Sequence, residues 1–247
     1  MPKWRPTEVR AVADLRGSER AEMLALFGRH FERVDPAAFH ADLDEKEHVA
    51  LVAGPDGRLA GFSTLVRIAA TVGGQAVAAT FSGDTIVDPS ARHTAALPRL
   101  LSRHIFAAAR AEPGVPAYWF LLSSGYKTYR LLPHLFRTFL PGGNAPPTAT
   151  EAAVLGVVAR ARYGERFDAG IVRLAHPTPL RPGVADLTEH RLRDPHVAFF
   201  ARANPGHAAG DELACLTRVH PDNLTAAGLR TVGPDLTEGW PGSGMRK

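Results

Sequence analysis

The sequence has a single cysteine, Cys215, so no disulfide can form within the chain. A lone thiol is typical of a reducing compartment, and we expect a cytoplasmic protein. No apolar run approaches the roughly 20 residues that a membrane-spanning helix requires, so we expect no membrane partner. Residues 1–6 include basic side chains but no apolar segment follows them, and we predict no signal peptide.

Runs of one charge are also missing. The 29 Lys and Arg residues exceed the 25 Asp and Glu residues, which gives a formal net charge of +4, but basic residues are scattered among acidic ones. Nucleic-acid binding needs basic side chains gathered on one surface, so we do not expect a nucleic-acid partner. The modest positive excess suits an anionic small ligand, such as a phosphorylated cofactor, equally well.

Several signature motifs of enzymes are absent. The 11 histidines include no H-E-x-x-H motif and no paired ligand spacing, so we expect no metal site. The absence of G-x-S-x-G excludes the nucleophile elbow of a serine hydrolase, and neither a P-loop nor a G-x-G-x-x-G fingerprint occurs. With 45% hydrophobic and 22% charged residues, the chain has the composition of a folded globular protein.

Hydrophobic periodicity and turn residues predict the order of elements along the first part of the chain. Apolar residues at helical spacing predict helices, apolar runs predict strands, and Gly-rich pairs mark hairpin turns. The predicted elements are helix 18–33, a short helix after Asp35-Pro36, strands 48–53, 59–69 and 75–87, helix 97–111, strand 118–122, and helix 125–140 with a kink at Pro133. The three consecutive strands are expected to form an antiparallel meander.

Residues 141–149, rich in proline and glycine, are predicted as a linker between a core of residues 1–140 and a C-terminal part of residues 150–230. Thr148 and Glu151 have the spacing of a capping box, which predicts a helix at the start of that part. The segments expected beyond this helix are strand 170–174, helix 197–202, strand 212–219 and a loose, Gly- and Pro-rich tail, residues 231–247.

The segment Val87–Leu97 combines the features of an anion-binding loop. A strand ends, a proline turns the chain, and Arg92 precedes small residues that open a helix. The first N–H groups of a helix lack intrahelical partners, and the helix dipole places partial positive charge there. A diphosphate can therefore approach the backbone at Ala95 and Ala96, with Arg92 adding a charge-assisted contact. The alternative is an ordinary strand-to-helix connection capped by Thr94.

The spacing V-x-P-x-x-R-x-x-A-x-L of residues 87–97 resembles the acyl-CoA-binding motif V-x-P-x-x-[Q/R]-x-x-G-x-[G/A] of the GNAT acyltransferases. Ala95 and Leu97 stand where that pattern has small residues, and Pro98 removes a backbone N–H just inside the helix. The element order of residues 15–140 is also similar to that family. The resemblance implies an α/β (α+β) fold, with a mixed, mostly antiparallel sheet flanked by helices and a C-terminal extension.

The resemblance also implies where an acyl-CoA would bind. The backbone of Ile86, Val87 and Asp88 would pair with its pantetheine arm, in the opening that this fold leaves between its fourth and fifth strands. The loop that would hold the diphosphate consists of Arg92, His93, Thr94, Ala95, Ala96 and Leu97. Acyl-CoA, with an acetyl or a longer acyl group, is therefore the expected co-substrate.

Two residues are candidates for the proton transfers of such a reaction. Tyr129 matches the tyrosine of the family's A-x-x-L-Y-x-x-x-G-F helix, which would protonate the leaving CoA thiolate as a general acid. The alternative is a core aromatic residue whose hydroxyl finds a backbone acceptor. Asp84 is a carboxylate within an apolar strand, so burial predicts a raised pKa and a general-base role toward the acceptor. Its alternative is an edge-exposed or Arg-paired carboxylate.

These inferences predict an enzyme that moves an acyl group from acyl-CoA to an amine of a small molecule by direct attack. Two alternatives remain open. One is a GNAT-like binding or regulatory module without CoA chemistry, and the other is an acyltransferase whose donor is an acyl carrier protein or an aminoacyl-tRNA. Loops Pro177–Val184 and Ala203–Asp211 are expected to cover the acceptor site, because the core alone needs only part of the chain.

Overall fold

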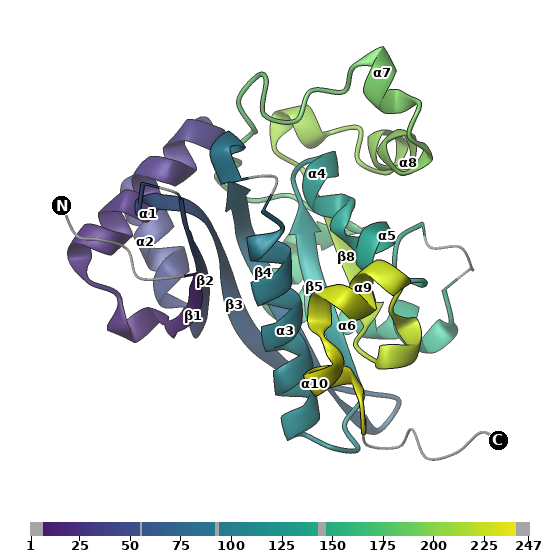
Figure 1. Ribbon diagram of the computed structural model, residues 1–247. Helices are drawn as coiled ribbons and strands as arrows, with labels where there is room; N and C mark the ends of the chain where they lie inside the picture. Colours follow the sequence, from purple (N-terminus) through teal and green to yellow (C-terminus); the bar gives the residue numbers. More distant parts are fainter. Residues whose placement is uncertain (1–6, 55, 92–93, 143–146, 241–247) are drawn as a thin grey trace.

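A mixed sheet organises the chain in the computed structural model, which describes residues 7–54, 56–91, 94–142 and 147–240 (Figure 1). Among these residues the sheet has eight strands, in the order β1-β2-β3-β4-β5-β8-β7-β6. The strands are β1 (Glu8–Ala11), β2 (His48–Ala53), β3 (Leu59–Val72), β4 (Gln75–Val87), β5 (Ala117–Ser123), β6 (Phe167–Asp168), β7 (Ile171–Val172) and β8 (Glu212–Arg218).

The strand directions confirm the predicted fold class, an α/β (α+β) arrangement with a mixed, mostly antiparallel sheet. Strands β2, β3 and β4 form the expected antiparallel meander, and β1 adds a strand to its outer edge. Strands β4 and β5 are parallel, whereas β5 and β8 are antiparallel. Because β8 lies beside β5, residues on both sides of the expected linker contribute to the same sheet.

The described helices flank this sheet. They are α1 (Gly17–His30), α2 (Pro36–Asp44), α3 (Ala96–Ala111), α4 (Tyr126–Tyr129), α5 (Leu131–Leu135), α6 (Ala149–Tyr163), α7 (Glu189–Leu192), α8 (Pro195–Ala203), α9 (Ala226–Val232) and α10 (Pro234–Thr237). Capping side chains explain where two of these helices, α2 and α6, begin. The Asp35 carboxylate accepts the Ala37 N–H at 2.9 Å, and Thr148 and Glu151 form the predicted capping box. Within the described ranges, none of the helices has the length and apolar character that a membrane crossing would need.

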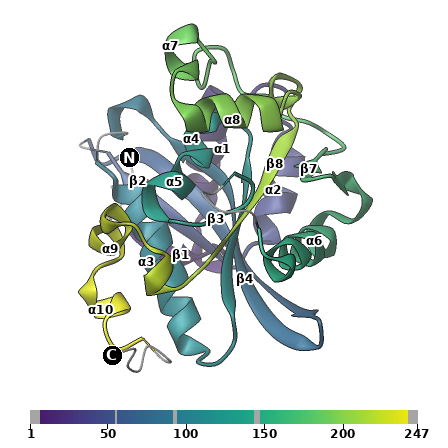
Figure 2. The same cartoon turned by 90° about the vertical axis from the view of Figure 1, so that its right-hand side faces the viewer.

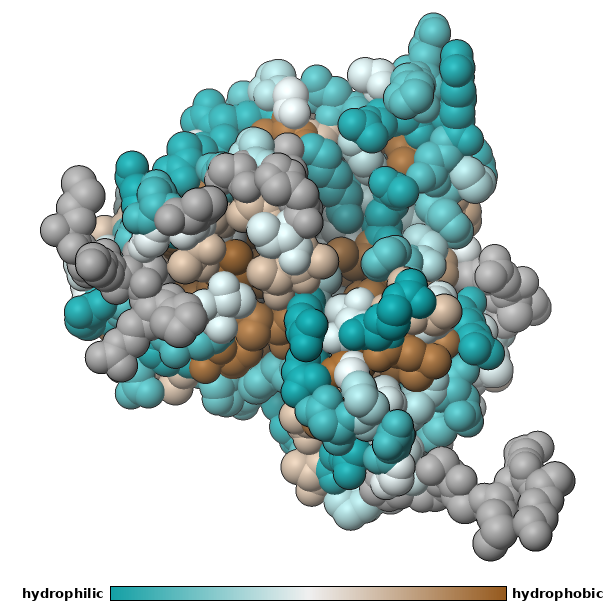
Figure 3. Space-filling model, viewed as in Figure 1, coloured by the Kyte–Doolittle hydropathy of each residue, from teal (hydrophilic) through white to brown (hydrophobic). Residues whose placement is uncertain are grey.

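Alternate residues of each strand face two different helix layers. In β2, Ala50 and Val52 pack toward α3, whereas Val49 and Leu51 pack toward α1 and α2. The first layer contains α3, α5, α9 and α10, and α6 extends the second layer over β3 and β8 (Figure 2). Figure 3 shows that hydrophilic residues cover most of the face that carries α3, with hydrophobic residues visible on either side of this helix.

The predicted helix over residues 125–140 is wrong in its length, because α4 and α5 replace it. Pro133 explains the break, since proline has no N–H to donate and its ring excludes the carbonyl four residues earlier, so it fits only in the first turn of a new helix. Beyond α5 the chain runs alongside other segments, with isolated bridges from Phe136 and Leu140 to Leu224 and Leu216. Large apolar residues of this segment are nevertheless buried, among them Tyr129, Leu132, Leu135, Phe136 and Phe139.

Residues 231–240, expected to belong to a loose tail, instead complete α9 and form α10. Their docking has two physical causes. The ring of Trp240 lies 5.5 Å from the ring of Phe106, and Arg103 forms an ion pair of 2.6 Å with Asp235. The rest of the expected tail, residues 241–247, lies outside the described residues.

Candidate functional site

Strands β4 and β5 diverge halfway along β4. They pair in parallel over Ala78–Ser82 of β4 and Ala117–Leu121 of β5, whereas β4 continues to Val87 alongside β3 alone. Parallel strands that separate in this way leave a gap between their backbones. The opening that the resemblance implies between the fourth and fifth strands is therefore present.

A bulge in β4 lies at the point of divergence. Phe62 of β3 pairs with Ile86, and Thr64 pairs with Gly83, so β4 contains an extra residue between these two pairs. Asp84 sits in the bulge with φ of 49°, a left-handed conformation that is uncommon for a residue with a side chain. Bulges redirect side chains locally, and here the bulge places a carboxyl group at the opening.

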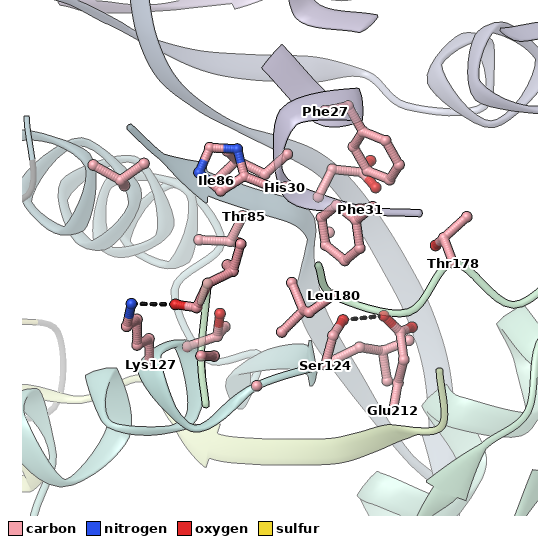
Figure 4. Close-up of a pocket in the computed structure, with 18 of the residues that line it drawn as sticks. Phe27, His30, Phe31, Thr85, Ile86, Ser124, Lys127, Thr178, Leu180 and Glu212 are labelled. Atoms are coloured by element: carbon pink, nitrogen blue, oxygen red, sulfur yellow. Dashed lines mark hydrogen bonds between the residues drawn. The ribbon is translucent and has the colours of Figure 1, made fainter. Parts of the chain in front are cut away.

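A cavity of about 650 Å³ occupies the opening (Figure 4). One end reaches Thr94–Ala96 at the start of α3, and the other reaches Asp42 of α2 and Tyr163 of α6. Gly83–Val87 of β4 and residues 174–185 supply much of the wall between them. Because α3 lies on one side of the sheet and α2 and α6 on the other, the cavity connects the two sides.

Thr94 forms hydrogen bonds on both sides within the described part of the loop before α3. The Thr94 hydroxyl donates to the Ala91 carbonyl at 2.8 Å and accepts the Ala96 N–H at 3.3 Å. Ala95 is exposed with φ of 50°, and it directly precedes the helix. Arg92 and His93, which belong to the predicted diphosphate loop, lie outside the described residues.

Two departures from the family pattern do not obstruct this loop. The Leu97 side chain is only 2% exposed and packs in the core under α3, where it forms part of the wall of the open cavity. Pro98 is the third residue of α3, where the N–H would have no intrahelical partner in any case. Neither residue therefore closes the approach to the start of the helix.

The predicted strand-end residues divide between the cavity and its rim. Ile86 and Val87 line the cavity. Asp88 is not among the lining residues. Its N–H donates to the Ala60 carbonyl at 2.7 Å, and its carboxylate lies 3.7 Å from the Arg29 guanidinium.

Tyr129 faces away from the cavity. Its side chain is fully buried and stacks on the ring of Phe199 of α8, with centroids 5.8 Å apart. The hydroxyl donates a hydrogen bond of 2.9 Å to the Pro141 carbonyl, and burial raises its pKa far above the ordinary value. The structure therefore places Tyr129 as the alternative describes, a core aromatic residue with a backbone acceptor, and does not bring it together with Asp84.

Asp84 lines the cavity as a half-buried carboxyl group. The Thr64 hydroxyl donates to it at 2.9 Å, and no basic side chain of the described residues lies within ion-pair distance of it. Burial raises its pKa, and the nearby Asp42 charge raises it further, while Lys46 acts in the opposite direction. The direction of this shift agrees with the expectation for a carboxyl group in an apolar strand.

Glu212, at the start of β8, is a second cavity carboxyl group that the sequence analysis did not select. The Ser124 hydroxyl donates a short hydrogen bond to it (Figure 4). Burial raises its pKa to about 7, and the charges of Asp84 and Asp42 contribute in the same direction. A carboxyl group at the start of an apolar strand is a pattern that the sequence does show for Glu212, similar to the carboxyl group within an apolar strand at Asp84. The sequence does not show that β8 lies beside β5, so it could not place Glu212 at the cavity.

Asp42, which lines the cavity, binds two cations, the buried Lys46 and the half-buried Arg162. The Lys46 ammonium contacts the Asp42 carboxylate and donates to its backbone carbonyl at 3.1 Å, while the Arg162 guanidinium lies 3.3 Å from the same carboxylate. The guanidinium of Arg162 also lies over the Phe81 ring, 4.9 Å from its centroid. Arg162 also lies 3.4 Å from the Glu45 carboxylate, so Asp42 and Glu45 pair with these cations, whereas Asp84 and Glu212 have no ion pair of their own among the described residues.

Residues 174–185 form a strap across the cavity, between α1 and α4. Leu180 makes an isolated bridge with Phe31, the Glu32 N–H donates to the Pro179 carbonyl at 2.8 Å, and the Arg181 N–H donates to the His30 carbonyl at 2.8 Å. The predicted covering loop Pro177–Val184 lies within this strap. The other predicted loop, Ala203–Asp211, supplies no residue to the described lining of the cavity.

No metal-binding arrangement accompanies these groups. Across the part of the chain that the structure describes, no three His, Cys, Asp or Glu side chains are placed to hold an ion. The groups that line the cavity include two carboxyl groups, a serine hydroxyl and the start of α3.

The sequence matches no protein-family model and no curated protein. Among solved structures, the chain is similar to a probable N-acyltransferase from Enterococcus faecalis, with 16% identity and a TM-score of 0.40 over 55% of this chain and 33% of that one. It is also similar to a GNAT family N-acetyltransferase from Escherichia coli in complex with CoA, with 17% identity and a TM-score of 0.36 over 53% of this chain and 69% of that one. A GNAT-like decarboxylase, GphF, in complex with isobutyryl-CoA gives 16% identity and a TM-score of 0.39 over 86% of this chain and its own full length. The chain thus spans about a third of the Enterococcus protein.

Proposed function

We propose that the chain transfers an acyl group from an acyl-CoA to an amine of a small molecule by direct attack on the thioester. The observation that best supports this is the continuity of the cavity. It joins the start of α3, where a helix N-terminus favours an anion, to Asp84 and Glu212, whose carboxyl groups have raised pKa values suited to proton transfer. The divergence of β4 from β5 is what connects the two ends.

In this proposal the donor enters from the α3 side. Its diphosphate would lie against the backbone of Thr94–Ala96, where the exposed Ala95 leaves room for close approach. Its pantetheine arm would follow Ile86 and Val87 along the part of β4 that β5 does not cover. The thioester would then reach the bulge that carries Asp84.

The two carboxyl groups can supply both proton transfers of the reaction. The amine attacks the carbonyl carbon, the C–N bond forms, the C–S bond breaks, and the attacking nitrogen must lose a proton. Burial raises the pKa values of both groups, and the charge of Asp84 raises that of Glu212 further, so ionisation of one carboxyl group favours the protonated form of the other. The ionised carboxylate accepts the proton of the amine, and the protonated carboxyl group supplies one to the departing thiolate.

The test is a measurement of free thiol released from acetyl-CoA and from a long-chain acyl-CoA in the presence of a panel of amines, with mass spectrometry of the products. We expect N-acylated product and an equal amount of free CoA. The Asp84→Asn, Glu212→Gln double variant should lose at least about a hundredfold in kcat/KM, as expected for removal of general acid–base groups.

The matched control is Asp14→Asn, which removes an exposed carboxyl group outside the cavity and should leave the rate unchanged. Thiol release that is the same in the double variant and in the native chain would overturn the assignment of the carboxyl pair. Absence of transfer from both CoA donors to every amine tested would overturn the proposed function, and a loaded acyl carrier protein would then be tested as donor.

A further inference from the structure

Two carboxyl groups that line the cavity, Asp84 and Glu212, have no cation within ion-pair distance among the described residues. Asp42, Asp84 and Glu212 contribute three carboxyl groups, whereas Lys46 and Arg162 contribute two cations that both pair with Asp42. Asp84 and Glu212 are held by hydroxyl groups alone, from Thr64 and Ser124. When either of these carboxyl groups ionises, its charge has no ion-pair partner among the described residues, and partly buried charge of this kind is stabilised by a counter-ion.

The wall next to this charge is apolar and aromatic. The rings of Phe27 and Phe31 are stacked with centroids 4.4 Å apart, and the Phe39 ring lies 5.3 Å from that of Phe27. All three line the cavity, together with Ile86 and Leu180. Figure 4 shows Phe31 and Leu180 on the way from Phe27 to the Ser124–Glu212 pair. A ligand that fills this part of the cavity therefore meets apolar surface along most of its length.

The aromatic wall and the acidic end adjoin each other on two elements. On α2, Phe39 and Asp42 are three residues apart, which places them on the same face of the helix. On β4, Asp84 lies two residues before Ile86, and both line the cavity. The apolar contact surface and the free carboxyl groups are thus parts of one subsite rather than separate features.

The strap closes this subsite over the same residues. Gly125, at the start of α4, lies so near the strap that an added Cβ would stand 2.7 Å from Leu180 Cδ1 and 3.0 Å from Ala185 Cβ. The strap is also bonded to α1 through the Leu180–Phe31 bridge. Closure on both sides limits the subsite to a ligand whose apolar part is compact.

From these observations we infer that the acceptor is a primary amine carried by a compact aromatic or similarly flat apolar group. Its ammonium group lies toward Asp84 and Glu212, and its apolar group lies between Phe27, Phe31 and the strap residue Leu180. The inference rests on the proposed function for the chemical role of the amine. Binding of the amine itself needs no donor, so it can be measured separately.

The experiment is calorimetric titration of the full chain, without any acyl-CoA, with three probes. These are 2-phenylethylamine, its neutral analogue 2-phenylethanol, and butylamine, which has the amine but no ring. We expect 2-phenylethylamine to bind at least about tenfold more tightly than either of the others, because only it satisfies both the charge and the apolar wall. Similar affinity for all three probes would overturn the inference.

Two sets of variants separate the contributions of charge and ring. Asp84→Asn with Glu212→Gln should remove most of the preference for 2-phenylethylamine over 2-phenylethanol, whereas Asp14→Asn should keep it. Leu180→Ala should weaken both ring-bearing probes and leave butylamine unchanged. Because Leu180 is only partly buried, at the edge of the cluster that contains Phe27 and Phe31, the fold should be retained. An unchanged preference in the double variant would contradict the placement of the ammonium group.

The outcomes also separate this inference from the proposed function. If 2-phenylethylamine binds as expected but receives no acyl group from any thioester, the proposed transfer fails and the ligand class stands. If butylamine is acylated as efficiently as 2-phenylethylamine, the transfer stands and the ligand class is wrong.

Discussion

The two sides of the sheet differ in how completely they are packed. On the side of α3, α5 and α9, buried apolar side chains form one continuous cluster around Trp119 and Phe136. On the side of α1, α2 and α6 the cluster is divided in two, and the cavity with its carboxyl groups lies where the packing is interrupted. The titratable groups with a candidate function therefore lie where the helices leave part of the sheet uncovered. We call the side of α1, α2 and α6 the open side, and the side of α3, α5 and α9 the closed side, which supports the fold.

Tyr129 and Asp84 show this difference at the level of single residues. Both were selected from the sequence as proton-transfer groups, but Tyr129 lies on the closed side with its hydroxyl bonded to Pro141. Asp84 lies at the open side, in a bulge that turns its carboxyl group into the cavity. Four predictions test whether the closed and open sides have the separate roles that this difference indicates.

The largest effect is expected on activity at the open side. Glu212→Gln alone should lower kcat/KM by about 10²- to 10⁴-fold, the usual contribution of a general acid or base. In the native chain, kcat/KM should fall as the pH rises through about 7, because loss of the remaining proton of the carboxyl pair removes the group that supplies a proton to the departing thiolate. The measurement is a pH–rate profile of both proteins, and a profile that is flat from pH 5 to 9 in the native chain would contradict the role of the pair.

A stability effect of similar size is expected on the closed side. Phe136 is 1% exposed and its ring lies 5.8 Å from that of Trp119, so Phe136→Ala should cost about 3 to 5 kcal/mol of unfolding free energy. The folded fraction of this variant should bind 2-phenylethylamine with native affinity. Denaturant unfolding and calorimetry on the same sample measure both quantities, and a large loss of affinity would mean that the two sides are not independent.

A smaller stability effect, of opposite sign, is expected at Glu212. Its pKa is raised from 4.5 to about 7 in the folded chain, so the folded state binds more protons and stability falls as the pH rises through that interval. Glu212→Gln removes this pH-dependent loss of stability, and the variant should be more stable than the native chain by about 3 kcal/mol at pH 8. The difference should vanish near pH 4, where both states are protonated, and equal melting temperatures at pH 8 would show that the carboxyl group is not destabilising.

The smallest effect is expected for Tyr129→Phe. Loss of the hydrogen bond to the Pro141 carbonyl should cost about 1 kcal/mol of stability, and kcat/KM should stay within about threefold of the native value. Thermal unfolding and the thiol-release assay measure the two quantities. A fall in turnover of a hundredfold, with unchanged stability, would return the general-acid role to Tyr129.

Local signals in the sequence predicted most of the elements and the bulge carboxyl group. The helix caps at Asp35 and Thr148, the strand meander and the loop before α3 depend on neighbouring residues, and their patterns are visible within short windows. Glu212 could not be placed in this way, because its partner Ser124 is 88 positions away in the sequence. The Tyr129 side chain points toward Phe199 of α8 and the Pro141 carbonyl. Neither residue belongs to the helix pattern of residues 125–140, so that pattern could not predict where the side chain points.

The most direct test of the account is whether acyl-CoA binds at the start of α3. Ala95 is exposed there with a left-handed backbone, a conformation that Asp and Asn tolerate better than most residues, so Ala95→Asp and Ala95→Asn form a matched pair that differs in charge. Calorimetric titration with acetyl-CoA should give micromolar affinity for the native chain and for Ala95→Asn, and at least about tenfold weaker binding for Ala95→Asp. Equal affinity in all three proteins would contradict the account, because a carboxylate at the start of α3 must repel a diphosphate held there.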